Sequence, residues 1–279
     1  MRDIQILQQA IENQCPEIHK KRLRSLMLAT KAVLDGSDLT LTKIGRALDT
    51  DTTVKHAIKR IDRLLGNRNL HREKESIYKW HASFITRANP FPVVLVDWSD
   101  VREQLRYMTL RASVSVKGRA VTLYEQAFEY KNYNSPKSHQ HFLDNLQSLL
   151  PKGCTPIIVS DAGFRNTWFR QVANKGWFWL GRVRGEVSIK CGEDSWQWNK
   201  TFYPQATNKP KFLGESQLAK RSPLKCFAYL YKSHPKGKKA YRHSRTCKKH
   251  SAGKVFHKGA KEPWLLSLIS PIMYLTALK

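Results

Sequence analysis

Two stretches of this chain share the pattern that most constrains its fold: a proline, a run of apolar and largely β-branched residues, and then an aspartate. The first covers residues 91–100 (FPVVLVDWSD) and the second covers residues 155–163 (TPIIVSDAG). Such runs predict strands buried on both faces, with each aspartate at the exit of its strand. If the strands are parallel neighbours, Asp97 and Asp161 meet at one edge of the sheet, where open α/β sheets usually place their chemistry.

Paired carboxylates without a His or Cys partner indicate a site for a hard divalent cation. Mg²⁺ takes oxygen ligands and often needs only one or two protein carboxylates plus phosphate oxygens. We therefore predict that Asp97 and Asp161 are metal ligands and catalytic residues, with Mg²⁺ as cofactor, Mn²⁺ as its substitute and a phosphate ester as substrate. Each aspartate alone has a plainer interpretation as a turn former, and Asp161 also as the N-cap of the next helix.

The charge of the chain favours nucleic acid as the partner. Lys and Arg number 49 against 22 Asp and Glu, a formal net charge of +27. A field of this sign attracts polyanions, with an anionic membrane surface a distant second possibility. No apolar run of the length that spans a bilayer and no signal-peptide core is found, and the 5 cysteines are scattered without a CxxC pair. A cytoplasmic protein with reduced thiols and no membrane partner is expected.

Residues 1–90 are expected to form a helical DNA-binding domain. Apolar residues at helical spacing predict helices over 4–15 and 23–33, and then over 71–86 with Ile77, Trp80 and Phe84 pointing inward. A helix-turn-helix-like arrangement is expected between the helices over 23–33 and 71–86. It consists of a short helix, a turn rich in Asp and Thr, and a second helix over 54–65.

The second of these helices has a basic face. It bears Lys55, Lys59, Arg60 and Arg63, which we predict to contact DNA. A solvated basic face is an equally ordinary interpretation of the same spacing.

Residues 91–184 are expected to form the catalytic core. After the strand that ends at Asp97, alternating runs predict a hairpin over 108–116 and 120–128, and then a helix over 138–150. The Asp161 strand, a helix over 165–175 and a strand over 177–184 follow. Three strands, a helix, a strand, a helix and a strand, with acids on the first and fourth strands, form the ribonuclease H-like order. The predicted fold class is therefore α/β, with a mixed ribonuclease H-like sheet.

Several motifs of this chain resemble those of one family. VLVDWSD at 94–100, IVSDAGF at 158–164, RIDRLLGN at 60–67 and GRVRG at 181–185 are similar to motifs of the DDE transposases of the insertion-sequence-four family. The similarity runs from about residue 4 to residue 264. It implies a bacterial transposase that binds double-stranded DNA at terminal inverted repeats and at target sites. It further implies cut-and-paste cleavage and strand transfer with Mg²⁺ at Asp97 and Asp161, and it is compatible with self-association on DNA.

Residues 185–262 resemble the β-rich insertion of the family, with one strand expected over 227–231. The lysines and arginines between 232 and 261 stand without a carboxylate among them, so we predict contacts to DNA phosphates there, although a solvated loop is the alternative. Zinc binding by His243, Cys247, His250 and His257 is disfavoured, because their spacing matches no common finger. The predicted DNA contacts are Lys238, Lys239, Arg242, Arg245, Lys248 and Lys249.

Residues 263–279 are expected to contain a strand that returns to the core and a tail that departs from the family. The family's third carboxylate lies in a Tyr-x-x-Arg-x-x-x-Glu-x-x-x-x-x-x-Lys signature, which this chain lacks, and Glu262 precedes the strand and does not match it. We therefore expect a C-terminally truncated or frameshifted transposase with impaired cleavage. A non-catalytic DNA-binding fragment that occupies transposon ends is the alternative. An unrelated ribonuclease H-like nuclease would need Asp100 or Glu103 as a further acid.

Overall fold

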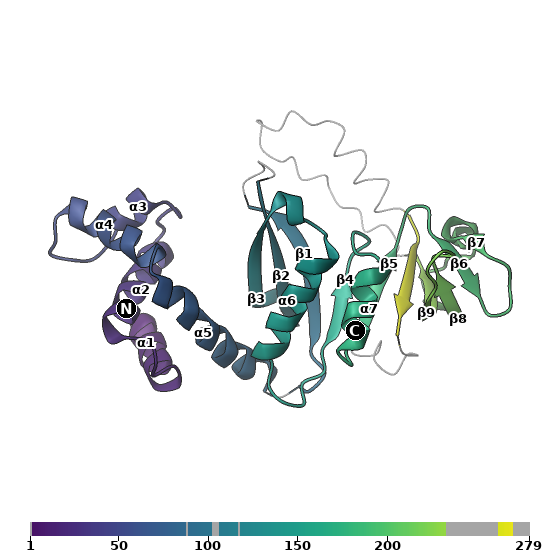
Figure 1. Ribbon diagram of the computed structural model, residues 1–279, viewed down its shortest axis with the longest axis horizontal. Helices are drawn as coiled ribbons and strands as arrows, with labels where there is room; N and C mark the ends of the chain where they lie inside the picture. Colours follow the sequence, from purple (N-terminus) through teal and green to yellow (C-terminus); the bar gives the residue numbers. More distant parts are fainter. Residues whose placement is uncertain (1, 88, 102–105, 117, 233–261, 270–279) are drawn as a thin grey trace. The chain divides into compact units, whose positions relative to one another are not determined.

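The chain folds into a helical unit and a unit built on one large mixed sheet (Figure 1). The computed structural model describes residues 2–87, 89–101, 106–116, 118–232 and 262–269. The first unit comprises Met1–Ala88 with Ser148–Lys152, and the second comprises Asn89–Gln147 with Gly153–Lys279. Among the described residues, no helix combines the length and the apolarity needed to cross a membrane.

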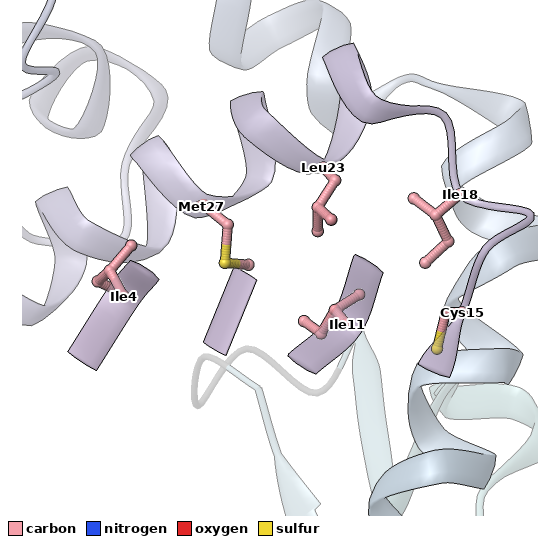
Figure 2. Close-up of a cluster of buried hydrophobic side chains, with 6 residues drawn as sticks. All are labelled: Ile4, Ile11, Cys15, Ile18, Leu23 and Met27. Atoms are coloured by element: carbon pink, nitrogen blue, oxygen red, sulfur yellow. The ribbon is translucent and has the colours of Figure 1, made fainter. Parts of the chain in front are cut away.

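The first unit contains the helices expected from the apolar spacing. Figure 2 shows how the first two pack: Ile4 and Ile11 face Leu23 and Met27, and Cys15 lies at the turn between the helices. All of these side chains are buried, so this contact forms a small hydrophobic core of its own. The helices are α1 (Arg2–Gln14), α2 (Lys20–Leu34), α3 (Leu41–Arg46), α4 (Val54–Leu65) and α5 (Arg68–Thr86).

Helices α3 and α4 approach each other closely at a glycine. A Cβ atom on Gly45 would lie 2.6 Å from the Cα of Ile58 and 2.9 Å from its backbone nitrogen. Only a residue without a side chain fits against the facing backbone at that distance. Ala57, Ile61 and Leu64 of α4 are buried on the side that faces the other helices. The short helix, turn and second helix expected from the sequence are thus present as a packed pair.

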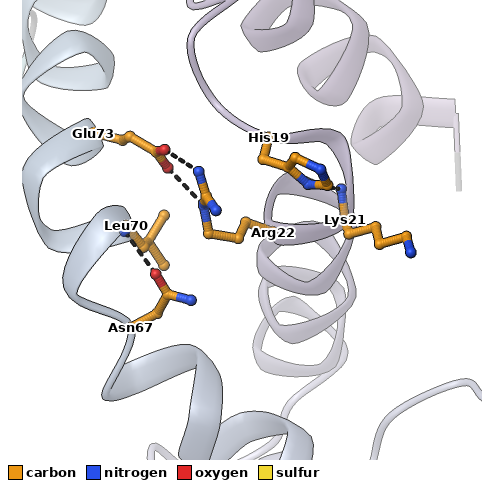
Figure 3. A network of polar contacts seen from close by, with 6 residues as sticks. All are labelled: His19, Lys21, Arg22, Asn67, Leu70 and Glu73. Atoms are coloured by element: carbon orange, nitrogen blue, oxygen red, sulfur yellow. Dashed lines mark hydrogen bonds and ion pairs between the residues drawn. The ribbon is translucent and has the colours of Figure 1, made fainter.

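Polar contacts fasten the ends of α2 and α5 (Figure 3). Arg22 forms a two-point ion pair with Glu73, in which Nε lies 2.9 Å from Oε2 and Nη2 contacts Oε1. His19 caps the start of α2 by accepting from the backbone N–H of Lys21 at 3.2 Å. Asn67 caps α5 by accepting from the N–H of Leu70 at 3.0 Å.

The inward face of α5 differs from the expected one at a single position. Ile77 and Trp80 pack against the core of α1 and α2, as predicted. Phe84 is 68% exposed, so its predicted inward position is wrong. The spacing of apolar residues allowed Phe84 on the packed stripe, but no partner helix covers it among the residues that the structure describes.

The second unit contains a sheet in the order β3-β2-β1-β4-β5-β10-β9-β8-β6-β7. Strands β1, β2 and β3 are antiparallel neighbours, whereas β1, β4 and β5 are parallel. The succession of elements from residue 91 to residue 184 is the predicted one, with helix α6 (Pro136–Leu149) after β3 and helix α7 (Asn166–Asn174) after β4. The strands of this part are β1 (Val93–Asp100), β2 (Tyr107–Val116), β3 (Arg119–Glu129), β4 (Ile157–Ser160) and β5 (Phe178–Val183).

The remaining strands extend the same sheet. The predicted strands over 227–231 and after residue 263 are present as β9 and β10, and three others were not predicted individually. Strand β10 lies between β5 and β9 and is antiparallel to both, so it joins the two halves of the sheet. These strands are β6 (Ser188–Cys191), β7 (Gln197–Trp198), β8 (Lys211–Leu218), β9 (Leu224–Tyr231) and β10 (Trp264–Leu268).

Helices α6 and α7 lie on the same side of the sheet (Figure 1). On this side, which we call the helix face, the indole Nε1 of Trp168 donates to the hydroxyl of Ser160 at 2.9 Å. Phe169 packs on Trp179 with ring centroids 4.5 Å apart. Because side chains alternate along a strand, the neighbouring residues of each strand point to the opposite side, which we call the open face. A smaller apolar cluster around Leu180, Tyr229 and Leu268 occupies part of the open face.

Candidate two-carboxylate site

The pairing of β1 with β4 brings the two predicted aspartates together. Val96 pairs with Ser160 in parallel register, so the next positions along the same register are Asp97 and Asp161. Ser160 also pairs with Gly181 of β5, which places Arg182 at the corresponding position on the other side of Asp161. By alternation, all three residues belong to the open face, since Ser160 is held by Trp168 on the helix face. The expected approach of the two acids is present, where the parallel pairing of β1 with β4 ends. Asp161 directly follows β4 as predicted, but Asp97 is not at the exit of its strand, because β1 continues to Asp100 by pairing with β2.

The two carboxylates influence each other's charge. The pKa of Asp97 is raised, first because the surrounding protein removes part of the hydration of its carboxylate and second because the negative charge of Asp161 repels it. The backbone N–H of Trp98 donates to Asp97 Oδ1 at 2.8 Å and partly opposes this rise. Two acids that share one site in this way gain from a cation that neutralises their repulsion.

Asp161 forms a turn and does not cap the next helix. Its Oδ1 accepts from the backbone N–H of Gly163 at 2.8 Å. Helix α7 begins at Asn166 with Arg165 at its N-cap position, so the N-cap interpretation of Asp161 is wrong. The turn interpretation holds for one oxygen of the carboxylate, and it fixes the direction of the group without consuming its second oxygen.

Arg182 and Glu262 lie close to this site. Arg182 stacks over the ring of Trp264, with its guanidinium carbon 4.7 Å from the centroid, and lies 3.8 Å from Glu262. Glu262 also pairs with Arg184 at 2.8 Å. The pKa of Arg182 is lowered by burial and then by Arg184, while Glu262 and, more weakly, Asp161 oppose that shift. Glu262 therefore pairs with the two arginines.

A cavity of about 570 Å³ lies between the segment that follows Asp161, helix α7 and the turn around Arg221, and it is rich in arginine. Its wall includes Ala162, which follows Asp161 directly, and a single carboxylate, Glu186. Low-dielectric walls lined mainly by one sign of charge focus the potential and attract anions. We call this cavity the arginine-lined hollow; its lining includes Arg165, Arg170, Arg182, Arg184 and Arg221.

Sequence reasoning did not single out this hollow. The GRVRG motif pointed to Arg182 and Arg184, but Arg165 and Arg221 belong to segments far apart in the chain. The structure joins these segments because Arg170 of α7 donates to the backbone oxygens of Ser222 and Pro223 at 2.9 and 2.8 Å. No local pattern in the sequence could have shown that contact.

A neutral histidine lies on the helix face behind the site. His139 is 3% exposed, and burial lowers its pKa to about 4. Its Nε2 accepts from the indole N–H of Trp98 at 3.3 Å, and its ring packs against Trp168 with centroids 4.9 Å apart. Because Trp98 follows Asp97 in β1, this contact links the buried core to the acid-bearing end of the strand.

The predicted DNA-contacting residues of α4 have different environments. Lys55, Lys59 and Arg63 are exposed. Arg60 is half-buried, and its Nε donates to the hydroxyl of Ser25 in α2 at 3.1 Å. Arg60 thus helps to hold α4 against α2, whereas the other three cations face the solvent.

Other predicted residues lie outside the part of the chain that the structure describes. These are Glu103, the six basic residues predicted between 238 and 249, and the four residues of the disfavoured zinc interpretation. Asp100 is described and lies three positions after Asp97 in β1, so alternation places it on the opposite face of the strand. That placement does not support Asp100 as a partner of Asp97. The six basic residues are Lys238, Lys239, Arg242, Arg245, Lys248 and Lys249.

The described residues contain no cluster of three or more His, Cys, Asp and Glu side chains able to hold a metal ion. Within the described residues, the candidate donor set is therefore a pair of carboxylates. Comparisons with known proteins do not add to this picture: the chain matches no family model, and no curated protein is similar enough to count as a relative.

Proposed function

We propose that this chain is a DNA transposase of the DDE class, which binds DNA ends and uses a divalent metal ion for strand cleavage and joining, with cleavage impaired because the sequence lacks the family's third acid motif. The observation that carries the proposal is the juxtaposition of Asp97 and Asp161 at the point where the parallel pairing of β1 with β4 ends. The order β3-β2-β1-β4-β5, antiparallel among the first three strands and parallel among the last three, supports a ribonuclease H-like core.

The side chains of the site fit a hard divalent cation. Asp97 and Asp161 supply carboxylate oxygens, and the N–H groups of Trp98 and Gly163 orient them from behind. A bound Mg²⁺ ion would supply activation of an attacking hydroxyl and stabilisation of the leaving oxygen of a phosphodiester. With only two described carboxylates, phosphate oxygens of the substrate would supply further ligands.

The arginine-lined hollow gives the DNA backbone a place beside the acids. Guanidinium groups bind phosphate oxygens in two-point geometry, and five arginines line the cavity that begins one residue after Asp161. Among them, Arg182 and Arg184 also pair with Glu262, and Arg170 bonds to the turn at Ser222. In this arrangement the arginines bind and orient a strand, while the two aspartates hold the cation at one phosphodiester. Positioning of this kind contributes much of the rate of phosphoryl transfer.

Metal binding tests the site without requiring cleavage. We expect the chain to bind Mn²⁺, followed by electron paramagnetic resonance of the free ion, and Asp97→Asn or Asp161→Asn to weaken binding at least about 100-fold. Replacing residues that only hydrogen-bond to metal ligands already lowers metal affinity by about 10- to 100-fold, so replacing a ligand itself should cost at least as much. The matched control is Asp144→Asn. Asp144 is an exposed acid of α6 that pairs with Lys175, and its replacement should leave the Mn²⁺ affinity unchanged. Equal binding by all four proteins would refute the site.

A second function is a DNA-binding module without catalysis, which the lack of a described third metal-ligating acid favours. Asp97→Ala separates the two. In nicking assays on supercoiled DNA with Mg²⁺ or Mn²⁺, a transposase loses nicking with this substitution and keeps its DNA affinity. A binding module shows no nicking in either form, and the affinity is likewise unchanged.

The contribution of α4 to DNA binding is tested by salt dependence. Replacing Lys55, Lys59 and Arg63 together with Gln should weaken binding and reduce the slope of log affinity against log salt by roughly 0.9 for each phosphate that the variant no longer neutralises. The matched control removes three exposed cations from α5. If the control lowers the slope equally, α4 has no special role. The control residues are Arg72, Lys74 and Lys79.

A further inference from the structure

Two exposed tyrosines form a stacked pair near the carboxylates. The rings of Tyr130 and Tyr133 have centroids 5.8 Å apart and planes inclined by only 5°. The residues are 43% and 39% exposed, respectively. Stacked aromatic rings provide a broad, flat apolar area, and here much of that area is in contact with water. Such a surface is suited to a flat partner.

The segment that bears the pair is fastened to both acid-bearing strand ends. Tyr133 packs edge-on against Trp98, the residue after Asp97, with centroids 5.2 Å apart. Asn134 adopts a left-handed backbone with φ of 54°, and its Nδ2 donates to the backbone oxygen of Gly163 at 3.1 Å. Gly163 in turn donates its N–H to Asp161. The tyrosine pair therefore keeps a defined position relative to both acids.

The charge of the acids reaches Tyr133. Its pKa is raised, first by loss of hydration and then by the negative charge of Asp161, with smaller effects from Tyr130 and Asp97. The phenol consequently stays neutral at physiological pH and adds no negative charge that would repel a phosphate. The effects of Asp161 and Asp97 on its pKa place the Tyr133 phenol within electrostatic range of both carboxylates.

We propose that Tyr130 and Tyr133 form a stacking platform for a nucleobase of an unpaired DNA strand and hold the nucleotide next to the phosphate that Asp97 and Asp161 receive. The inference rests on the proposed function, because it takes DNA as the substrate. Every nucleobase has an apolar face, so stacking on aromatic side chains tolerates any sequence. The base must leave its own helix first, which selects single-stranded or frayed ends over intact duplex. The net charge of +27 favours a polyanion over an uncharged flat ligand.

Fluorescent oligonucleotides test the platform in the full chain. One duplex carries a short single-stranded 3′ overhang with 2-aminopurine, and a blunt duplex has the same paired sequence; both are titrated in EDTA, so that cleavage does not interfere. We expect quenching of 2-aminopurine and about tenfold tighter binding of the overhang duplex by the native chain, as stacking of a single base provides. Tyr130→Ala with Tyr133→Ala should abolish both effects and keep the affinity for the blunt duplex.

Two further variants serve as controls. Tyr130→Phe with Tyr133→Phe keeps the rings and should keep quenching and the preference for the overhang. Phe84→Ala removes another exposed aromatic side chain, on α5, and should behave like the native chain. Circular dichroism checks that each variant is folded.

The outcomes separate this inference from the proposed function. Binding of both duplexes with equal affinity and without quenching would overturn the platform and leave DNA binding intact. Equal loss of affinity for both duplexes in the folded Ala variant would also overturn it, because the tyrosines would then support general binding. Absence of binding to either duplex by the native chain would refute the platform and the proposed function together.

Discussion

The two faces of the sheet around β1, β4 and β5 are built from the same strands but have opposite chemistry. On the helix face, Val94 and Ile158 are fully buried. On the open face, Leu95 is 38% exposed. The acids Asp97 and Asp161 lie further along the same face, beyond the paired residues of β1 and β4. A shift of one residue in register would exchange the faces, so burial on one face specifies the register strongly. Packing under the helices thereby aligns the acids on the other face.

The largest expected effect on the helix face comes from adding a methyl group at Gly181. A Cβ atom there would overlap Cζ of Phe169 and lie 2.7 Å from its Cε1, and Phe169 is already packed on Trp179. We expect Gly181→Ala to destabilise the sheet unit by roughly 3 kcal/mol, the upper range for overpacking. Urea unfolding followed by tryptophan fluorescence measures this. Phe169→Leu in the same background should recover part of the loss, and a cost below about 1 kcal/mol would contradict the close packing.

Protonation of His139 tests the same face by pH. Its pKa is about 4 in the folded chain against 6.5 for the free side chain, so between these values the unfolded state binds more protons. Stability should therefore fall as the pH decreases from 6.5 towards 4, by up to roughly 3 kcal/mol. His139→Gln keeps an acceptor for the Trp98 N–H but cannot titrate in this range. If the variant shows the same pH dependence as the native chain, other groups are responsible.

Substitutions at two adjacent positions of β1 allow a direct comparison of the two faces. Val94 is fully buried on the helix face, and Leu95 is partly exposed on the open face. We expect Val94→Ala to cost roughly 2 kcal/mol, because it leaves a cavity under the helices. Leu95→Ala removes more atoms but should cost less than about 1 kcal/mol, because solvent already reaches the side chain. Equal losses in paired urea titrations would show that the open face is packed as tightly as the helix face.

The sequence predicted most clearly those parts of the molecule that depend on local pattern. Strands β1 and β4 followed from their β-branched runs, and the hairpin of β2 and β3 from alternation around a glycine turn. Strand β8 was not predicted, because Gly214, Ser216 and Gln217 interrupt its apolar pattern. It forms because it pairs along its length with β9, a long-range contact that local propensity does not contain.

The candidate site also has one part that the sequence predicts and another that it does not. The approach of Asp97 and Asp161 could be predicted, because the same pattern occurs in two strands that pair in parallel. The end of β1 could not, because its pairing with β2 extends the strand to Asp100. The arginine-lined hollow and the placement of the tyrosine pair beside the acids could not, since each depends on contacts between segments distant in the chain. Asn134 reaches Gly163, and Arg170 reaches the turn at Ser222. Periodicity shows which side of an element is apolar, but not which other segment a polar side chain will meet.

The smallest expected effect is a gain in stability, in contrast to the losses above, and it concerns Asp97 on the open face. The raised pKa of Asp97 means that the folded chain binds more protons than the unfolded chain just above pH 4, so this group lowers stability as the pH rises through that range. Asp97→Asn removes the cost of a partly dehydrated charge and, second, the repulsion by Asp161. It should raise the stability of the metal-free chain at pH 7 by up to about 0.5 kcal/mol, the usual range for a surface position. Urea unfolding in EDTA measures the gain, and added Mn²⁺ should reverse the ranking by stabilising only the native chain. A metal-free Asp97→Asn variant less stable than the native chain would mean that this carboxylate supports the fold, and the contrast between a face that stabilises and a face that binds would not hold.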